Sequence, residues 1–403
     1  MSDRMSGNSL PSSLPFLKLA AALPLFVLVW VLATGCAGVR GSATAVAAPA
    51  VSPSPAPNAS PSPTPAASPS PSPTPNPNAT TFVYATDAGS LLSNDSVGQL
   101  FIMNTRDGST TQINVPGGPR GLAVTPDASR IYIVQGDASS VAVIDSGSNQ
   151  LIATIPVGHA PERVAISPNG RFAYVTNFQD GTVSVIDTAM NAVVNTIFTD
   201  SVPWAVAFSS DGRWAYVTLF DEVGFFGGPH HENALVVIDI TTQSICKKIP
   251  LLTGNSMAAS PTRHELYTVG SAFGLAIVDT ETNELAGQVP LDSGQQEAVA
   301  VSPDGQTIYV VELGNVDIGH EDPRMDAPAT VYVISAEQRA VIATAHTEPG
   351  LVSIGLSPDG STAYLLENDI SLPGMKTMDT KTLTFGPLIP MADTPIQLTV
   401  GTH

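Results

Sequence analysis

A repeat of about 42 residues runs through the chain from residue 81 onward and constrains its fold more than any other feature. Each unit has a strand with a tyrosine and then a strand that ends in Val-Ile-Asp or a relative, and in six units a Ser-Pro-Asp-Gly type turn precedes the tyrosine strand. The tyrosines are Tyr84, Tyr132, Tyr174, Tyr216, Tyr267, Tyr309 and Tyr364. The third strands end at Asn104, Asp145, Asp187, Asp239, Asp279, Ser335 and Asp379. Both series have seven members, so the chain contains seven units.

The residues inside a unit are those that short strands and tight hairpins require. Proline presets the backbone angle at the second turn position, and the Asp-Gly pair supplies the left-handed residue of a tight turn. VSVID (183–187) alternates β-branched residues, as strands in stacked sheets do. A four-stranded unit that recurs every 40 to 45 residues is typical of a propeller blade. The sequence therefore predicts an all-β chain, a seven-bladed β-propeller of four-stranded blades.

The two ends of the repeat region are complementary. The region begins directly with a tyrosine strand, TFVYATD (81–87), and lacks the strand that precedes the tyrosine in the other units. The C-terminal segment PIQLTV (395–400) resembles PERVAIS (161–167), which occupies that missing position. We therefore expect the C-terminal strand to join the N-terminal blade and close the ring.

The segments YVTN (174–177), VIDT (185–188) and SPDG (302–305) resemble the repeat consensus of the YVTN-repeat, or YncE-like, β-propellers. The resemblance covers residues 81–403. It implies a fold but no single function, because the relatives include cell-surface binding proteins, propeller lactonases and propeller subunits of periplasmic redox enzymes. The motif acids, such as Asp187, are expected to bond turn backbone rather than to catalyse a reaction.

The N-terminus resembles a bacterial lipoprotein signal. Residues 19–33 (LAAALPLFVLVWVLA) form an apolar run that is short for a membrane span, which needs about 20 residues, and normal for a signal-peptide core. The following LATGC resembles a lipobox, although its leucine lies one position too early. We expect residues 1–35 to be a signal peptide and Cys36 to be lipidated. Ordinary cleavage and an uncleaved anchor are the alternatives.

Residues 36–80 differ from both neighbouring regions. After Cys36 they are largely Pro, Ser, Ala, Thr and Asn, which provides nothing to bury. Such a segment is expected to be a disordered, semi-rigid stalk on the order of 100 Å long. The expected location is the bacterial cell envelope, periplasmic or at the cell surface, with the membrane contacted through the lipid anchor. The propeller domain then spans residues 81–403.

Composition excludes several classes of partner and cofactor. The chain has 16 basic and 35 acidic residues, a formal net charge of −19, so we expect no nucleic-acid partner. Only two cysteines occur, Cys36 and Cys246, which rules out a Cys-x-x-Cys-His motif and therefore predicts no covalent haem. Cys246 is expected in the fourth strand of its blade as a lone thiol. The propeller is expected to be a monomer.

Length variation is concentrated in one connection of the repeat. The spacing from each Val-Ile-Asp position to the next tyrosine is 28 to 30 residues, whereas the spacing from tyrosine to Val-Ile-Asp within a unit is 12 to 26. The three long insertions, at about 87–97, 220–233 and 313–328, therefore fall between the second and third strands of blades 1, 4 and 6. In a propeller these connections lie on one face, around the mouth of the central channel, where a rigid scaffold carries a binding site.

Candidate site residues gather on the same face. Histidines and acids there are suited to zinc or copper, the divalent metals such ligands would hold. The candidate metal ligands are His230, His231, Glu232, Asp221, His320 and Asp322. The candidate binding-face residues are His159, Phe225, Phe226, Glu321 and His346. The alternatives are solvated or partner-contacting loops, and phenylalanines packed onto the rim.

Two function classes remain open. The first is a non-catalytic binding or scaffold module that holds a protein, glycan or small-molecule partner on the elaborated face, because no nucleophile motif is present. The second is a metal-dependent enzyme of lactonase or hydrolase type, a metal-handling protein, or a subunit of a periplasmic redox system. Glu312 and Glu367, which replace the consensus asparagine, would belong to such a site or be surface variation. No cofactor is certain, and an enzymatic role is the less favoured interpretation.

Overall fold

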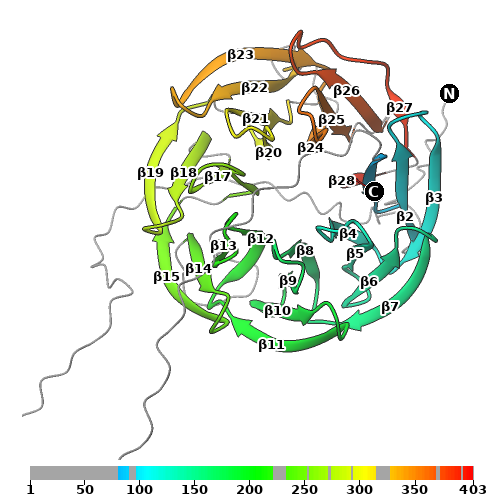
Figure 1. The fold of residues 1–403 in the computed structure, drawn as a ribbon, viewed down its shortest axis with the longest axis vertical. Helices are drawn as coiled ribbons and strands as arrows, with labels where there is room; N and C mark the ends of the chain where they lie inside the picture. Colours follow the sequence, from blue (N-terminus) through cyan, green and yellow to red (C-terminus); the bar gives the residue numbers. More distant parts are fainter. Residues whose placement is uncertain are drawn as a thin grey trace, which may run out of the picture. The chain divides into compact units, whose positions relative to one another are not determined.

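The computed structural model describes residues 80–89, 97–220, 233–251, 254–270, 274–291, 294–314, 327–368, 373–391 and 394–402. These residues form seven four-stranded antiparallel sheets arranged in a ring (Figure 1). The described part of the chain contains no α-helix, and therefore none long and apolar enough to cross a membrane. The predicted fold, a seven-bladed β-propeller of four-stranded blades, is confirmed.

Every blade consists of four strands, ordered from the innermost to the outermost. Blade 1 is β28 (Pro395–Thr402), β1 (Thr81–Asp87), β2 (Val97–Asn104) and β3 (Thr110–Pro116). Blade 2 is β4 (Pro119–Val124), β5 (Arg130–Gln135), β6 (Ser140–Asp145) and β7 (Gln150–Pro156). Blade 3 is β8 (Pro161–Ile166), β9 (Phe172–Asn177), β10 (Thr182–Asp187) and β11 (Ala192–Phe198). Blade 4 is β12 (Val202–Phe208), β13 (Trp214–Phe220), β14 (Ala234–Asp239) and β15 (Ser244–Pro250).

The remaining three blades follow the same order. Blade 5 is β16 (Ser256–Ala259), β17 (Glu265–Gly270), β18 (Gly274–Asp279) and β19 (Glu284–Val289). Blade 6 is β20 (Gln296–Val301), β21 (Thr307–Glu312), β22 (Ala329–Ser335) and β23 (Ala340–Thr347). Blade 7 is β24 (Leu351–Leu356), β25 (Thr362–Glu367), β26 (Gly374–Asp379) and the short β27 (Ile389–Pro390).

The hydrophobic core is divided into layers between neighbouring blades. One layer joins Tyr84 and Leu100 of blade 1 to Leu122 and Ile131 of blade 2, all buried. The tyrosine of every repeat is at most 6% exposed, so its ring contributes to such a layer. The repeat therefore encodes packing between blades, and neighbouring repeats bury apolar faces that a single blade would expose.

The recurring polar residues of the repeat hold turn backbone. Ser302 Oγ donates to Asp304 Oδ1 at 2.5 Å, and the same carboxylate accepts the N–H of Gln306. Asp187 Oδ1 accepts the N–H groups of Ala189 and Met190 in the turn that follows its strand. The structural role expected for these acids is confirmed.

The ring is closed as the sequence predicts. Strand β28 pairs antiparallel with β1 along its length, from Thr402 opposite Thr81 to Leu398 opposite Ala85. At the far end of the pair, Asp87 Oδ1 accepts the N–H of Thr394 at 2.9 Å. The last strand of the chain therefore completes the first blade.

The ring has two different faces. Turns between first and second strands, and between third and fourth strands, lie on the face that we call the smooth face. The connections between second and third strands, and the links between blades, lie on the opposite, crowned face. Thr81 and Thr402 both lie at the smooth face, because they pair beside the turn after β2, where Thr105 N–H donates to Thr81 O.

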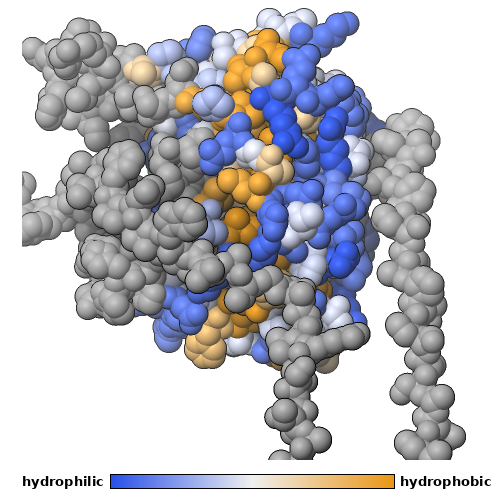
Figure 2. Space-filling view, turned by 90° about the vertical axis from the view of Figure 1, so that its left-hand side faces the viewer, coloured by the Kyte–Doolittle hydropathy of each residue, from blue (hydrophilic) through white to orange (hydrophobic). Residues whose placement is uncertain are grey.

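The outermost strands of blades 2 to 6 share a β-bulge, and they carry exposed apolar side chains. In blades 2 to 6 the pairing of the third and fourth strands shifts register at the same point, which marks a β-bulge in each blade. The extra residues are Ile152, Val194, Cys246, Ala286 and Ile342. Figure 2 shows apolar side chains crossing the rim on the side of β15, β19 and β23. A bulge on an edge strand discourages pairing with another strand.

Candidate functional site

Charged and aromatic side chains occupy the crowned end of the innermost strands, which we call the mouth. Within the first three residues of these strands, where the other blades have mainly apolar or small residues apart from Gln397, stand Arg120 in β4, Glu162 and Arg163 in β8, Trp204 in β12 and Glu297 in β20. We call these five residues the mouth cluster. They come from four blades, so only the closed ring brings them to one end of its axis.

Local backbone irregularity places these side chains. The inner strands β4, β8, β12 and β20 all shift register against their second strands at this end. A bulge re-aims a side chain that would otherwise continue the alternation of the strand. The bulged backbone is held by threonines of the second strands, because Thr86 Oγ1 donates to Arg120 O at 2.5 Å and Thr218 Oγ1 accepts the N–H of Ala205.

One such threonine joins blade 3 to blade 4. The Thr176 hydroxyl accepts the N–H of Arg163 at 3.1 Å and donates to Trp204 O at 2.8 Å. The Arg163 guanidinium then lies 5.3 Å from the centroid of the Trp204 ring, a cation–π contact. Trp204 itself packs edge-to-face between Phe178 and Phe220, with centroid distances of 5.9 and 5.7 Å. Arg163 is therefore fixed by backbone, hydroxyl and ring contacts.

The charges of the mouth cluster are only loosely paired with one another. Arg163 Nη1 lies 4.0 Å from Glu162 Oε2, and these side chains are 22% and 13% exposed. Arg120 Nε is buried and has no hydrogen-bond partner among the described residues. Glu297 Oε1 accepts a hydrogen bond from the neutral Gln295. Arg163 Nη1 also donates to Glu162 O at 3.3 Å, so the partners of this guanidinium are a backbone carbonyl and a ring rather than a close carboxylate. Partly buried charges without a close ion pair are candidates for ligand contacts.

Burial dominates the acid–base properties of the two glutamates. Burial raises the pKa of Glu162 above its usual value, while Arg120 and Arg163 act in the opposite direction. Burial likewise raises the pKa of Glu297, against the hydrogen bond from Gln295 and the charge of Arg163. Both carboxyl groups therefore take up a proton at a higher pH than an exposed glutamate does.

Most of the site residues expected from the sequence lie outside the described residues: His230, His231, Glu232, Asp221, His320, Asp322, Phe225, Phe226 and Glu321. Among the residues that the structure describes, no group of three or more His, Cys, Asp or Glu side chains is arranged to hold a metal ion. The metal site is therefore not tested and stays a prediction.

The two remaining candidates, His159 and His346, are both described. His159 lies in the link before β8, where its side chain is 71% exposed and its Nδ1 lies 2.9 Å from Asp180 Oδ1. His346 lies inside β23 rather than in the link after it, because this strand continues to Thr347, and its Nδ1 is 3.2 Å from Thr330 Oγ1. Neither histidine is part of the mouth cluster.

Glu312 and Glu367 have partners in their own blades. The Tyr332 hydroxyl donates to Glu312 Oε2 at 2.5 Å. Glu367 is buried and pairs with Lys376, whose Nζ lies 2.8 Å from Oε2. Both acids therefore make contacts within the scaffold. Cys246 lies in β15 as expected and is partly buried.

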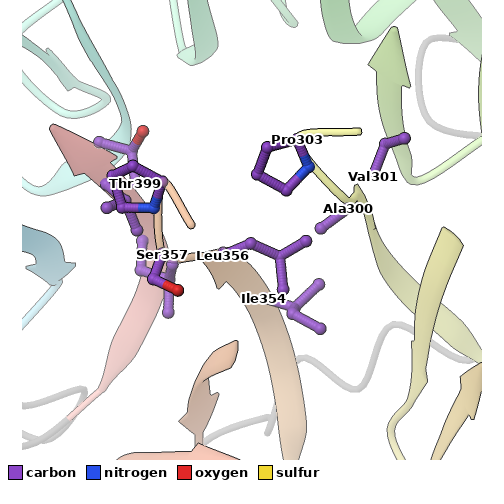
Figure 3. Close-up of a pocket in the computed structure, with 11 residues that line it drawn as sticks. Ala300, Val301, Pro303, Ile354, Leu356, Ser357 and Thr399 are labelled. Carbon is purple, nitrogen blue, oxygen red and sulfur yellow. The ribbon is translucent and has the colours of Figure 1, made fainter. Parts of the chain in front are cut away.

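A separate pocket lies toward the smooth end of the inner strands (Figure 3). It has a volume of about 360 Å³ and is lined by β20, β24, β28 and the turns beside them, including Ile354, Leu356 and Thr399. It carries no ionisable side chain, so it offers shape without the charge of the mouth.

The sequence contains a signal for the mouth cluster that the repeat pattern conceals. PRGLAV (119–124), PERVAI (161–166) and PWAVAF (203–208) align as equivalent inner strands. The apolar residues at their ends recur, whereas the second residue changes from Arg to Glu to Trp. Charged or aromatic residues at the second and third positions of otherwise apolar strands would have indicated the mouth.

Comparison with known proteins places the chain among propellers. The model of the cytochrome D1 haem domain family matches residues 128–250, which span β5 to β15 and include Glu162, Arg163 and Trp204. No curated protein matches the sequence. Hydrazine synthase from Kuenenia stuttgartiensis is similar in structure, with a TM-score of 0.57 and 20% identity over 66% of this chain and 77% of that one.

A second similar structure is the dihydro-haem d1 dehydrogenase NirN in complex with DHE. Its TM-score is 0.53, with 14% identity over 79% of this chain and 74% of that one. Identities this low establish a shared fold and nothing finer. The chain is thus a β-propeller, and its membership in the YVTN-repeat family stays a prediction.

Proposed function

We propose that the protein is an extracytoplasmic β-propeller that binds a small carboxylate-bearing ligand at the mouth and serves as a binding subunit of a redox system. The mouth cluster carries the proposal. Arg120 and Arg163 present guanidinium groups, which suit the geometry of carboxylates, and Arg163 is held in place before a ligand arrives. A held donor loses little conformational entropy on binding.

The redox context rests on the similar proteins and on the N-terminal segment. A haem-domain family model covers the part of the chain that carries three of the five cluster residues. The two similar structures are named as a hydrazine synthase and a dihydro-haem d1 dehydrogenase. The signal-like residues 1–35 and Cys36 support a lipid-anchored protein outside the cytoplasm. These observations favour a redox partner over a purely structural scaffold.

The mouth fits only part of a haem-type macrocycle. Its arginines suit the carboxylate groups that such macrocycles carry. Iron also needs an axial ligand such as His, Cys, Met or Tyr. Of the described histidines on the crowned face, His159 bonds Asp180 and His346 lies in the outer strand β23. The described histidines therefore supply no axial ligand at the mouth, and the fit of the described residues to haem is limited to its carboxylate groups.

Replacing Arg163 by glutamine is expected to weaken carboxylate binding by about 10- to 100-fold, because a hydrogen bond to a charged group contributes about 1.5–3 kcal/mol. Valerate is a suitable probe, with binding to the full chain followed by calorimetry. Haem b in a parallel titration tests the haem interpretation through its absorbance.

Arg213→Gln is the matched control. Arg213 lies over Trp214 at 5.2 Å, the same kind of contact as Arg163 makes, but in a smooth-face turn. We expect this variant to bind valerate as the unaltered protein does. Equal affinity in Arg163→Gln and the unaltered chain would refute the proposed site.

Valerate binding is expected to strengthen as the pH falls from 7 toward the range in which Glu162 and Glu297 take up protons, because burial raises the pKa of both carboxyl groups. The pKa values of Glu162 and Glu297 are raised above 4.5, the usual value for glutamate. As the pH falls, both groups therefore take up a proton, and lose their negative charge, earlier than an exposed glutamate does. Their repulsion of the ligand carboxylate then disappears while the arginines stay charged. Below about pH 5 the ligand itself is protonated and binding declines. Calorimetry at several pH values at constant ionic strength gives this profile, and an affinity that falls steadily as the pH is lowered from 7 would contradict it.

A further inference from the structure

The mouth cluster contains two cations and two anions, and this balance points to more than carboxylate binding. Arg120, Glu162 and Arg163 lie on the adjoining blades 2 and 3, whereas Glu297 lies on blade 6. Both guanidinium groups of the cluster are therefore on one side of the mouth. Glu297 is on another side, where the charge of Arg163 still acts on it but no close ion pair joins these two described residues. A ligand that carries only negative charge brings no group that could pair with Glu297 at hydrogen-bond distance.

The contacts of each charged group support a ligand that carries more than a negative charge. Arg120 Nε is a buried donor without an acceptor among the described residues. The 4.0 Å between Arg163 Nη1 and Glu162 Oε2 is the outer limit of an ion pair, and Glu297 bonds an uncharged amide. Partly buried ions are stable when opposite charges or hydrogen bonds reach them. Within the mouth cluster, neither the guanidinium groups nor the carboxylates are fully paired.

We propose that the ligand of the mouth is a zwitterion, whose carboxylate contacts Arg120 and Arg163 and whose ammonium group contacts Glu297. The inference rests on the proposed function and adds the second charged group to the ligand. Such a ligand satisfies the donors of blades 2 and 3 and the acceptor of blade 6 at once. Ligands with a single charge satisfy one side and bury the other unpaired, which selects against them.

Three probes of similar length separate the contributions: δ-aminovalerate with both charges, valerate with the carboxylate, and pentylammonium with the cation. We expect the full chain to bind δ-aminovalerate on the order of tenfold more tightly than valerate, the effect of one charge-assisted hydrogen bond. Glu297→Gln should abolish this advantage and leave valerate binding unchanged or stronger. Glu284→Gln, which alters an exposed acid in β19 that pairs with Lys247, is the control and should change neither affinity.

The outcomes separate the two proposals. Equal binding of δ-aminovalerate and valerate, unaffected by Glu297→Gln, overturns the zwitterion inference and leaves the carboxylate site in place. Failure of both carboxylates to bind overturns the carboxylate site as well. A thermal melt of each variant confirms that the ring is folded, and Glu297 is the second residue of β20 and only partly buried.

Discussion

Removal of residues 395–403 is expected to prevent the chain from folding to a closed ring. Strand β28 supplies the innermost strand of blade 1, and without it β1 has an open edge and the layer between blades 7 and 1 loses Leu398, which is 4% exposed. Burial of apolar surface is the main contribution to stability, and domains are stable by only about 5–15 kcal/mol. Near-UV circular dichroism and a thermal melt of the truncated chain provide the measurement.

Milder substitutions serve as controls for the truncation. Leu398→Ala keeps the strand but removes buried side-chain volume, and should cost about 2–5 kcal/mol in the free energy of unfolding. Thr402→Ala, at an exposed position of the same strand, should have little effect. A truncated chain that melts cooperatively at the temperature of the full protein would show that β28 does not close the ring.

Lys376→Met is expected to destabilise the propeller by about 3–5 kcal/mol, because it leaves the buried Glu367 with an uncompensated charge. Lys376 Nζ lies 2.8 Å from Glu367 Oε2 and 2.6 Å from Glu348 Oε2. The Lys376 and Glu367 side chains are 11% and 4% exposed. Urea unfolding at pH 7 measures the loss. The double variant Lys376→Met, Glu367→Gln should recover most of it, because no buried charge remains.

The surface pair formed by Lys247 and Glu284 provides the matched control. Its Nζ–Oε1 distance is 3.3 Å, but Glu284 is 71% exposed, so Lys247→Met should cost no more than about 1 kcal/mol. If Lys376→Met is no worse than Lys247→Met, the buried pair is not important for stability.

The Lys376 cluster also predicts a pH dependence. The hydrogen bond from Lys376 lowers the pKa of Glu348 from 4.5 to about 2. A lowered pKa means that the folded state favours the charged carboxylate. Its stabilising effect is therefore complete above pH 4.5 and is lost as the pH falls toward 2. In Lys376→Met this acid-dependent loss should be smaller.

The fold could be predicted because the same pattern of strands and turns recurs in seven units. The tyrosines, the Ser-Asp turns and PIQLTV (395–400) each correspond to a contact that recurs around the ring. A single unit would have been ambiguous. The position of His346 was missed by a small margin, since β23 is eight residues long where β19 has six.

The mouth cluster could not be predicted in the same way, because it depends on departures from the repeat. Arg120 and Glu297 are 177 positions apart in the sequence and meet at one end of the axis only after all blades have packed. The long insertions predict a site at His230, His231 and His320 instead, and these residues lie outside the described residues. Loop length indicates the face that is elaborated, but the innermost strands determine what lies at its centre.

The chain enters the ring at Thr81 and leaves it at Thr402, both at the smooth face. Any segment attached before residue 80 is therefore joined to the propeller on the side opposite the mouth. An engineered fusion, affinity tag or surface-coupling group at either of these ends would leave the crowned face accessible. The same polarity separates two evolutionary constraints, because changes in the attachment segment and changes at the mouth affect opposite faces of the ring and can accumulate independently.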